Sequence, residues 1–132
     1  MARKRTYWGV SEESVSEIPM EKFIKLTTSR NRRTLLRLKN NPVLKAFIEK
    51  VRKIKQKGAK KMIKTHVRDA IVLPEWVGLT FGVHNGKEFK TVEITPDRVG
   101  GRLGDFSFTV GRVLHSGPGV GATRGSKFVP LK

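Results

Sequence analysis

Basic side chains are concentrated in one part of this chain, between Arg30 and Arg68. Fifteen of these thirty-nine positions are Lys or Arg, and only one, Glu49, is acidic. Ammonium and guanidinium groups bind phosphates by charge, and each phosphate that they neutralise releases condensed counterions. A run of one sign this dense exceeds what an ordinary solvated helix face carries. The segment therefore predicts phosphate binding and a polyanionic partner.

No other group of side chains has the spacing of a catalytic or metal site. His66, His84 and His115 lack metal-ligand spacing and an acidic partner pair, which argues against zinc binding and general-base catalysis. A glycine-rich stretch near residue 120 resembles a dinucleotide fingerprint, but its third glycine is misplaced and no helix follows it. The sequence has no cysteine, which excludes disulfides and cysteine nucleophiles. We expect no enzyme activity, no metal and no cofactor.

The positive charge lies mainly in the first half of the chain. The sequence holds 28 Lys and Arg against 11 Asp and Glu, for a net charge of +17. Residues 1–70 carry 20 basic and 6 acidic residues, or +14, which leaves +3 for residues 71–132. At 132 residues the chain fits a single small domain, and self-repulsion opposes its compaction until a partner neutralises it. This favours a component of an assembly over a free-standing enzyme.

No segment has the pattern of a secretory signal or of a membrane span. The basic start of the chain is followed by no apolar region, and the longest apolar run, residues 70–73, stops at Pro74. A basic amphipathic helix also suits a membrane surface, but here its apolar face is needed to cover a sheet. We expect a soluble, cytoplasmic protein with no membrane partner.

The basic residues must be positioned by helices, and three are expected. Pro19 opens a short helix through Leu26, and the Thr and Ser residues at 27–29 cap a second helix that extends to about Lys39. The third helix begins at Asn41 and Pro42, where a side-chain oxygen caps free amides, and runs to about Gln56. Its predicted apolar face consists of Val43, Leu44, Phe47, Ile48, Val51 and Ile54.

Segments rich in β-forming residues follow the helices. A basic loop over 58–64 leads into a strand-like stretch at 70–73. Residues 79–83 and 89–94 then form a hairpin, because Asn85-Gly86 between them is a strong hairpin signal. The expected fold class is α+β.

The chain is expected to divide into three parts. Residues 1–18 form an extended basic arm, residues 19–110 a single α+β RNA-binding domain, and residues 111–132 a flexible tail whose glycines and prolines cannot anchor a core. Aromatic residues near the basic segments can stack on unpaired bases, namely Tyr7, Trp8, Trp76 and Phe128. Trp76 lies beside the expected sheet and fits a core position better.

The order and spacing of residues after the predicted strand turn carry more information than composition does. The pattern consists of Asn85, Gly86, Lys87, Ile94, Val99, Gly100, Leu103, Gly104, Asp105, Phe106 and Thr109. It resembles the signature of the small-subunit ribosomal protein family numbered nineteen. The match continues upstream over residues 64–78 and downstream over 118–132, and the two terminal extensions resemble the archaeal and eukaryotic branch. Many members carry a histidine where this chain has Gly101.

The resemblance implies a compact unit with helices packed on a small mixed three-stranded sheet, in the head of the small ribosomal subunit. It implies binding to the 3′ major domain of small-subunit ribosomal RNA, beside the head protein numbered thirteen. For the archaeal and eukaryotic branch it also implies a C-terminal tail that reaches toward the decoding site and its transfer RNAs. The main alternative is a DNA-compacting, chromatin-like protein, because the same charge can neutralise duplex DNA. An RNA-processing enzyme is a third class.

Candidate RNA-binding residues come from the basic segment, the hairpin tip and the tail. Those expected to contact ribosomal RNA are Arg30, Arg32, Arg33, Arg52, Lys53, Lys55, Lys57, Lys60, Lys61, Lys64, Arg68, Asn85, Lys87 and Arg102. Those expected near the decoding site are Arg124, Lys127 and Lys132. We expect phosphate contacts and shape recognition, with little reading of base edges.

Overall fold

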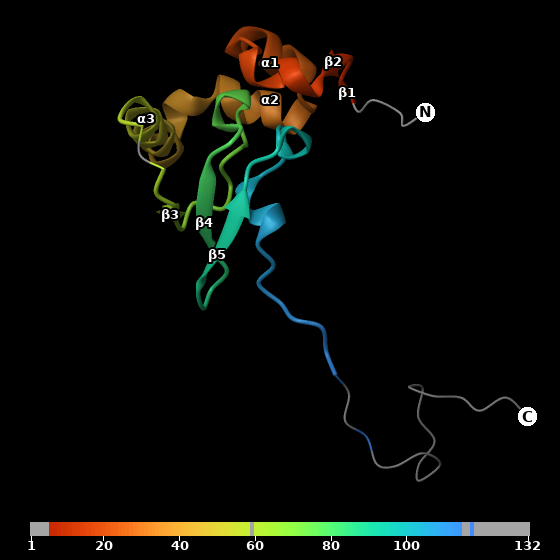
Figure 1. Ribbon diagram of the computed structural model, residues 1–132, viewed down its shortest axis with the longest axis vertical. Helices are drawn as coiled ribbons and strands as arrows, with labels where there is room; N and C mark the ends of the chain where they lie inside the picture. Colours follow the sequence, from red (N-terminus) through yellow and green to blue (C-terminus); the bar gives the residue numbers. More distant parts are fainter. Residues whose placement is uncertain (1–5, 59, 115–116, 118–132) are drawn as a thin grey trace, which may run out of the picture.

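The protein has an α+β fold, as expected, with helices in the first half of the chain and a small sheet in the second. The computed structural model describes residues 6–58, 60–114 and 117 (Figure 1). The α-helices are α1 (Met20–Leu26), α2 (Ser29–Leu36) and α3 (Pro42–Gln56). The strands are β1 (Thr6–Tyr7), β2 (Val10–Ser11), β3 (Ile63–Thr65), β4 (Thr80–His84) and β5 (Phe89–Glu93). Short 3₁₀ segments lie at Glu12–Glu17, Leu38–Asn40, Pro74–Trp76, Pro96–Arg98 and Leu103–Phe106.

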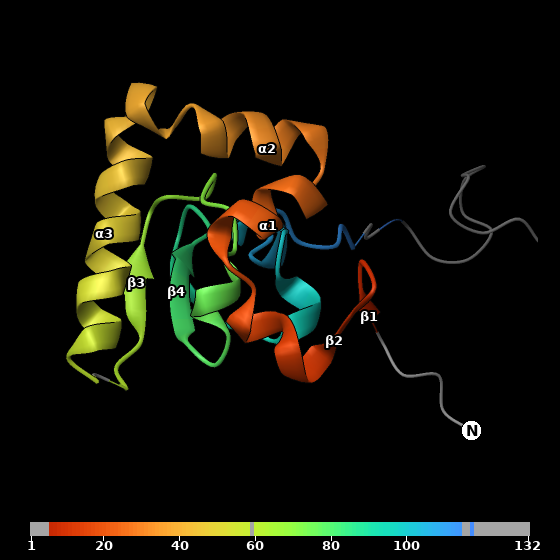
Figure 2. The ribbon, with the colours of Figure 1, turned by 90° about the horizontal axis from the view of Figure 1, so that it is seen from above.

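The main sheet is mixed, in the order β3-β4-β5. β3 is parallel to β4, and β4 is antiparallel to β5. α1 and α2 lie at the end of the sheet opposite the β4–β5 turn (Figure 1), and α3 runs beside β3 (Figure 2). The three-stranded mixed sheet that the family resemblance implies is therefore confirmed.

The helices begin and end near the predicted residues, with one exception. At the start of α3, Asn41 Oδ1 accepts a hydrogen bond from the Leu44 amide at 3.2 Å, and Pro42 occupies the first turn. This is the predicted cap, which satisfies an amide that the helix itself cannot pair. α2 ends at Leu36 instead of near residue 39, and the chain then tightens into the 3₁₀ turn Leu38–Asn40.

The third strand does not lie where the sequence analysis placed it. β3 forms in the segment predicted to be a loop, whereas residues 70–73 contribute only an isolated bridge between Ile71 and Arg102. Residues 70–73 are almost fully buried and bond to residues 100–103 through single backbone contacts such as Val72 N to Gly101 O at 2.8 Å. In a sequence, a short buried apolar run has the pattern of a strand even where the chain forms no regular structure. That ambiguity explains the misplacement.

Residues 6–17 are also more ordered than an extended arm. β1 and β2 pair antiparallel around Trp8 and Gly9, and a 3₁₀ helix follows. Val15 in that helix is fully buried, and the Tyr7 ring stacks on Phe23 of α1 with ring centroids 6.5 Å apart. The Tyr7 ring and Val15 therefore secure this segment to the core. Residues 1–5, the basic start of the predicted arm, lie outside the described residues.

The core lies between α3 and the sheet and is centred on Trp76. The Trp76 side chain is fully buried, with ring centroids 5.7 Å from Phe47 of α3 and 5.2 Å from Phe81 of β4. The expectation that Trp76 is a core residue is confirmed, so its ring is unavailable for stacking on a nucleobase. Trp8, at the β1–β2 turn, is 60% exposed.

The described chain after Ser107 leaves the body of the molecule without regular secondary structure (Figure 1). Its apolar side chains are largely exposed, namely Phe108, Val110, Val113 and Leu114. Nearly all of the predicted tail beyond Leu114 lies outside the described residues, including the tail candidates Arg124, Lys127 and Lys132 and the aromatic residue Phe128.

Candidate nucleic-acid interface

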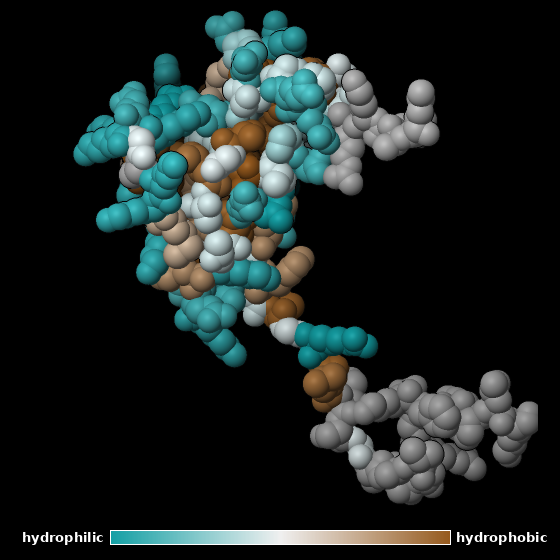
Figure 3. All heavy atoms as spheres, viewed as in Figure 1, coloured by the Kyte–Doolittle hydropathy of each residue, from teal (hydrophilic) through white to brown (hydrophobic). Residues whose placement is uncertain are grey.

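The outer face of α3 carries a strip of exposed cations. The helix buries Leu44, Phe47, Ile48 and Val51, while Val43, predicted to share that face, is 63% exposed. The exposed cations of the helix and its C-terminal end are Lys45, Lys50, Arg52, Lys53, Lys55 and Lys57. Figure 3 shows hydrophilic side chains gathered over this helix. Packing against the sheet on one side thus displays the charges on the other.

Two of these cations, Arg52 and Lys55, donate hydrogen bonds to Glu75. Arg52 donates from Nε and Nη2 to Glu75 Oε1 at 3.1 and 3.0 Å, and Lys55 Nζ donates to the Glu75 backbone carbonyl. The Arg52 and Glu75 side chains are 48% and 34% exposed. Such a pair is weakly stabilising and can exchange for a phosphate. The side chains of Arg52 and Lys55 are therefore less available to bind a phosphate than those of Lys53 and Lys57.

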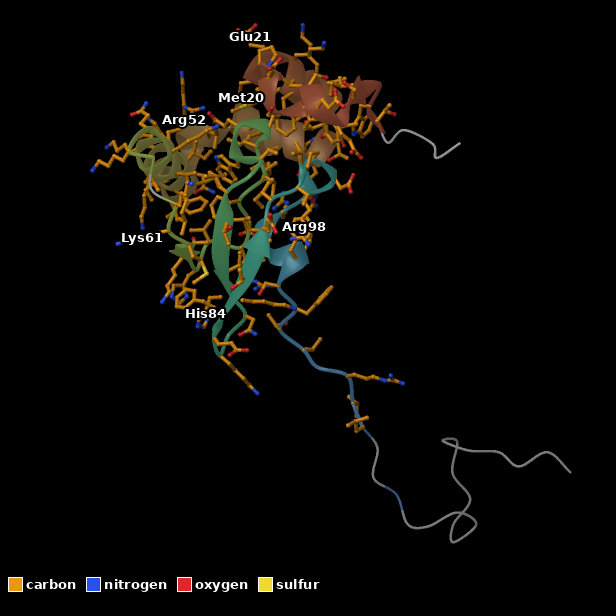
Figure 4. The ribbon with its side chains drawn as sticks, in the orientation of Figure 1. Met20, Glu21, Arg52, Lys61, His84 and Arg98 are labelled. Atoms are coloured by element: carbon orange, nitrogen blue, oxygen red, sulfur yellow. The ribbon has the colours of Figure 1, made fainter. Side chains whose placement is uncertain are left out.

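The cationic strip of α3 continues into the loop and strand that follow it. Lys60, Lys61 and Lys64 are all exposed, because β3 buries Ile63 and Thr65 and turns Lys64 outward. Lys61 lies beside β3, and Arg52 lies over α3 (Figure 4). The structure therefore brings the candidates from Lys53 to Lys64 onto adjoining elements.

Arg68 has an internal role that the sequence did not reveal. Its guanidinium donates to the backbone carbonyls of His84 at 2.5 Å, Gly104 at 2.9 Å and Ser107 at 2.6 Å. These three acceptors lie at the end of β4 and around the 3₁₀ turn at 103–106. With its donors directed into the protein, Arg68 holds these segments together.

The arginines of α2 divide into two groups. Arg32 donates to the carbonyls of Ile24, Lys25 and Thr27 at 3.1, 2.9 and 3.3 Å, so it satisfies the C-terminal end of α1. Arg30 and Arg33 are exposed, and the structure gives them no ion pair within its described residues. These two arginines extend the available cationic surface to a second helix.

Arg102 also has contacts within the protein. Its Nη2 lies 3.5 Å from Thr34 Oγ1, and its Nη1 lies 3.9 Å from an Asp69 carboxylate oxygen. Its backbone amide donates to Asp105 Oδ2 at 3.2 Å, so the Asp105 carboxylate satisfies a free amide at the start of the 3₁₀ turn at 103–106. Nearby, a Cβ added to Gly101 would lie 2.8 Å from the Phe106 ring. A histidine at residue 101 would therefore require that ring to move.

The hairpin tip presents Lys87, while Asn85 organises the turn. Asn85 Oδ1 accepts from the Lys87 and Glu88 amides at 3.0 and 2.9 Å. Gly86 has φ +100°, which a side chain disfavours, and the hairpin predicted from Asn85-Gly86 is confirmed. Lys87 is exposed at the tip. Of the two candidates in the loop, Lys87 has the freer side chain.

Three aromatic rings form a group beside this hairpin that the sequence did not predict. His66, His84 and Phe89 come from β3's end, β4 and β5, with ring centroids 4.4 to 5.1 Å apart. Strand register was the missing information, because the placement of β3 at residues 63–65 sets His66 beside His84. Within the described ranges, no cluster of His, Asp and Glu has the form of a metal site. Likewise, none of the helices there is long and apolar enough to cross a membrane.

Comparisons with known proteins agree with the resemblance in the sequence. The model of the family described as Ribosomal protein S19 matches residues 36–115. A small ribosomal subunit protein uS19 from Methanococcus maripaludis is 44% identical over 129 residues, which cover 96% of this chain and 80% of the relative. The uS19 of Metallosphaera sedula is 45% identical over 131 residues, covering 98% and 93% of the two chains. On this evidence the chain belongs to the ribosomal protein S19 family.

Proposed function

We propose that this protein is a structural constituent of the small ribosomal subunit, in the cytoplasm, and that it binds small-subunit ribosomal RNA. The observation that carries the proposal is the cationic surface formed by α3, β3 and the lysines between them, Lys57, Lys60 and Lys61, in a chain of this family. Phosphates are the matching ligands, because exposed ammonium groups gain affinity by displacing counterions from a nucleic-acid backbone.

The cations divide into binding and structural groups. Lys53, Lys57, Lys60, Lys61 and Lys64 supply most of the phosphate contacts, since their side chains are exposed and the described residues offer them no ion pair. Further contacts come from exposed residues on α2 and the hairpin, namely Arg30, Arg33 and Lys87. Arg32, Arg68 and Arg102 act mainly by holding backbone segments in place.

The finer placement rests on the family resemblance. We place the protein in the head of the subunit, on the 3′ major domain of the ribosomal RNA and beside the head protein numbered thirteen. The tail, with Arg124, Lys127 and Lys132, extends toward the decoding site and transfer RNA. Cross-linking of each tail residue in intact ribosomes, with and without bound transfer RNA, tests this placement.

Sedimentation tests the assignment as a whole. A tagged copy of the full chain is expected to run with small subunits in cell extract at physiological salt. A protein that runs free of the subunits would contradict the proposal. Competition binding separates the DNA-compacting alternative, because equal affinity for random duplex DNA and for the 3′-domain ribosomal RNA transcript would favour compaction. An RNA cleavage rate that disappears on replacing His66, His84 or His115 would instead support an enzyme.

A further inference from the structure

The sheet has one buried face and one outer face, and the outer face has an unusual composition. Strand register places Ile63, Phe81, Val83 and Val92 on the inner face, where they are at most 5% exposed. Alternate residues of β3, β4 and β5 therefore point outward. Those that concern us are Lys64, His66, Gly82, His84, Phe89 and Thr91. Met62 covers Gly82 on this face, with its Sδ 3.1 Å from the position of an added Cβ, and Thr91 Oγ1 donates to that sulfur at 3.6 Å. Beside Met62, the outer face carries rings and a lysine where a second core layer would carry aliphatic side chains.

Three of these side chains form one contiguous set of rings, the ring cluster His66–His84–Phe89. The His66 and His84 centroids are 4.4 Å apart with an interplanar angle of 35°. Phe89 meets both rings edge-on, at 5.1 Å from His66 and 4.9 Å from His84. His66 is exposed, while His84 and Phe89 are half-buried. Mutual contact limits the motion of the rings, and the exposed His66 ring leaves π surface accessible to a ligand.

Polar groups around the ring cluster suit a nucleotide. The Lys64 ammonium lies 5.5 Å from the Phe89 ring centroid, and Lys87 is exposed on the adjoining turn. The Gly86 amide donates to His84 Nδ1 at 3.0 Å, so in the neutral imidazole the proton resides on Nε2 as a free donor. Figure 4 shows His84 near the turn end of the sheet, on the side where Lys61 also lies. Glu88, also exposed on the turn, is the acidic residue closest in sequence to this group.

We propose that the ring cluster is a stacking site for an unpaired nucleobase of RNA, with Lys64 and Lys87 binding the phosphates on either side. The inference deepens the proposed function and rests on it. Sequence-tolerant recognition of single-stranded RNA uses rings of this kind on an open sheet face beside cations. A base within a duplex is already stacked on its neighbours, so the site selects single-stranded or bulged nucleotides.

The experiment compares binding of two RNA probes to the full chain. One is a single-stranded oligonucleotide with one central 2-aminopurine, and the other is a fully paired duplex of the same length. His66→Ala is expected to weaken binding of the single strand about fivefold or more, the low end for one stacked base. Duplex binding is expected to change less than twofold. The quenching of 2-aminopurine seen with the wild-type protein should also be lost.

Matched variants distinguish stacking from charge and from folding. His66→Phe keeps a ring and should retain the single-strand affinity and the quenching. Lys64→Ala should lower the slope of log affinity against log salt on both probes, whereas His66→Ala should leave that slope unchanged. A urea midpoint for His66→Ala close to that of the wild type confirms that the fold is intact.

Two outcomes would overturn the stacking site. One is an unchanged single-strand affinity in His66→Ala, and the other is an equal loss on both probes. Failure of the proposed function gives a different result, because it would appear as wild-type protein that does not sediment with small subunits. A protein that sediments with subunits and binds RNA with a steep salt slope, but is insensitive to His66→Ala, would refute the stacking site alone.

Discussion

Arg68→Ala is expected to destabilise the fold while leaving the electrostatic affinity for RNA almost intact. The substitution removes three hydrogen bonds from a charged donor to the carbonyls of His84, Gly104 and Ser107. Ser107 is fully buried, and its hydroxyl donates to the Val83 carbonyl at 3.2 Å, so the segment that it anchors lies against β4. Loss of Arg68 therefore leaves carbonyls without their donor where the chain turns away from the sheet.

The size of the effect follows from the bonds lost. A hydrogen bond to a charged group contributes about 1.5–3 kcal/mol. The three bonds share one half-buried side chain, and water can replace part of their contribution, so we expect a total loss of about 2–4 kcal/mol. For a domain of roughly 100 residues this corresponds to a fall in Tm of roughly 10–30 °C.

Urea unfolding followed by tryptophan fluorescence measures this loss. Trp76 is fully buried and reports unfolding of the core, while the exposed Trp8 contributes a nearly constant background. High salt, about 0.5 M KCl, screens repulsion between the excess cations. A lower midpoint at unchanged slope is the expected result.

Two variants serve as controls. Arg68→Lys keeps the charge, but a single ammonium cannot span three separated carbonyls, so most of the stability loss should remain. Lys53→Ala removes an exposed cation and should change stability by less than about 0.5 kcal/mol. The reasoning would be refuted if Arg68→Ala unfolded at the wild-type midpoint while its salt slope for RNA binding fell by about one unit, since Arg68 would then be a phosphate ligand.

Three further predictions concern the cationic surface and the N-terminal hairpin. Replacing Lys60, Lys61 and Lys64 together by alanine should lower the salt slope by about two to three units with little change in sequence preference, measured by filter binding; a change in preference at constant slope would contradict phosphate contact. Gly100→Ala places a Cβ 2.5 Å from the Tyr7 hydroxyl, so it should lower thermal stability by about 1–3 kcal/mol more than Gly78→Ala, which has nearly the same φ but no atom within 4 Å. Burial raises the pKa of Tyr7 above 10.0. The contribution of the neutral Tyr7 phenol to the free energy of unfolding is complete below pH 10 and is lost as the pH rises through the folded-state pKa. Tyr7 is the only tyrosine in the sequence, so titration of its phenolate absorbance should show a midpoint above that of the unfolded chain.

Features that depend on local chemistry were predicted correctly from the sequence. The Asn41-Pro42 start of α3 and the Gly86 turn both follow from backbone groups within a few residues, and both are present. The burial of Trp76 was also expected. The cap and the turn need no knowledge of distant partners, because each satisfies hydrogen bonds within its own segment.

Features that depend on distant partners were not predictable. The buried run 70–73 is as apolar as a strand, but its neighbours at 100–103 give it single bonds and no ladder. Residues 6–17 were predicted to form an extended arm, yet Val15 is fully buried and the half-buried Tyr7 ring stacks on Phe23 of α1. In both cases the deciding contact lies far along the chain, outside the range of any local pattern.

The sequence by itself determined the charge of +17, its concentration before residue 70, the family and hence the polyanionic partner. Only the tertiary structure decided which cations are free to meet that partner. Arg68 and Lys64 look equivalent in the sequence, but the carbonyls that engage Arg68 lie 16, 36 and 39 residues away, and folding brings them together. The alternation of β3 leaves Lys64 exposed on the outer face of the sheet, with its ammonium 5.5 Å from the Phe89 ring centroid. Charge is a property of composition, whereas its availability depends on which backbone oxygens the fold places within reach.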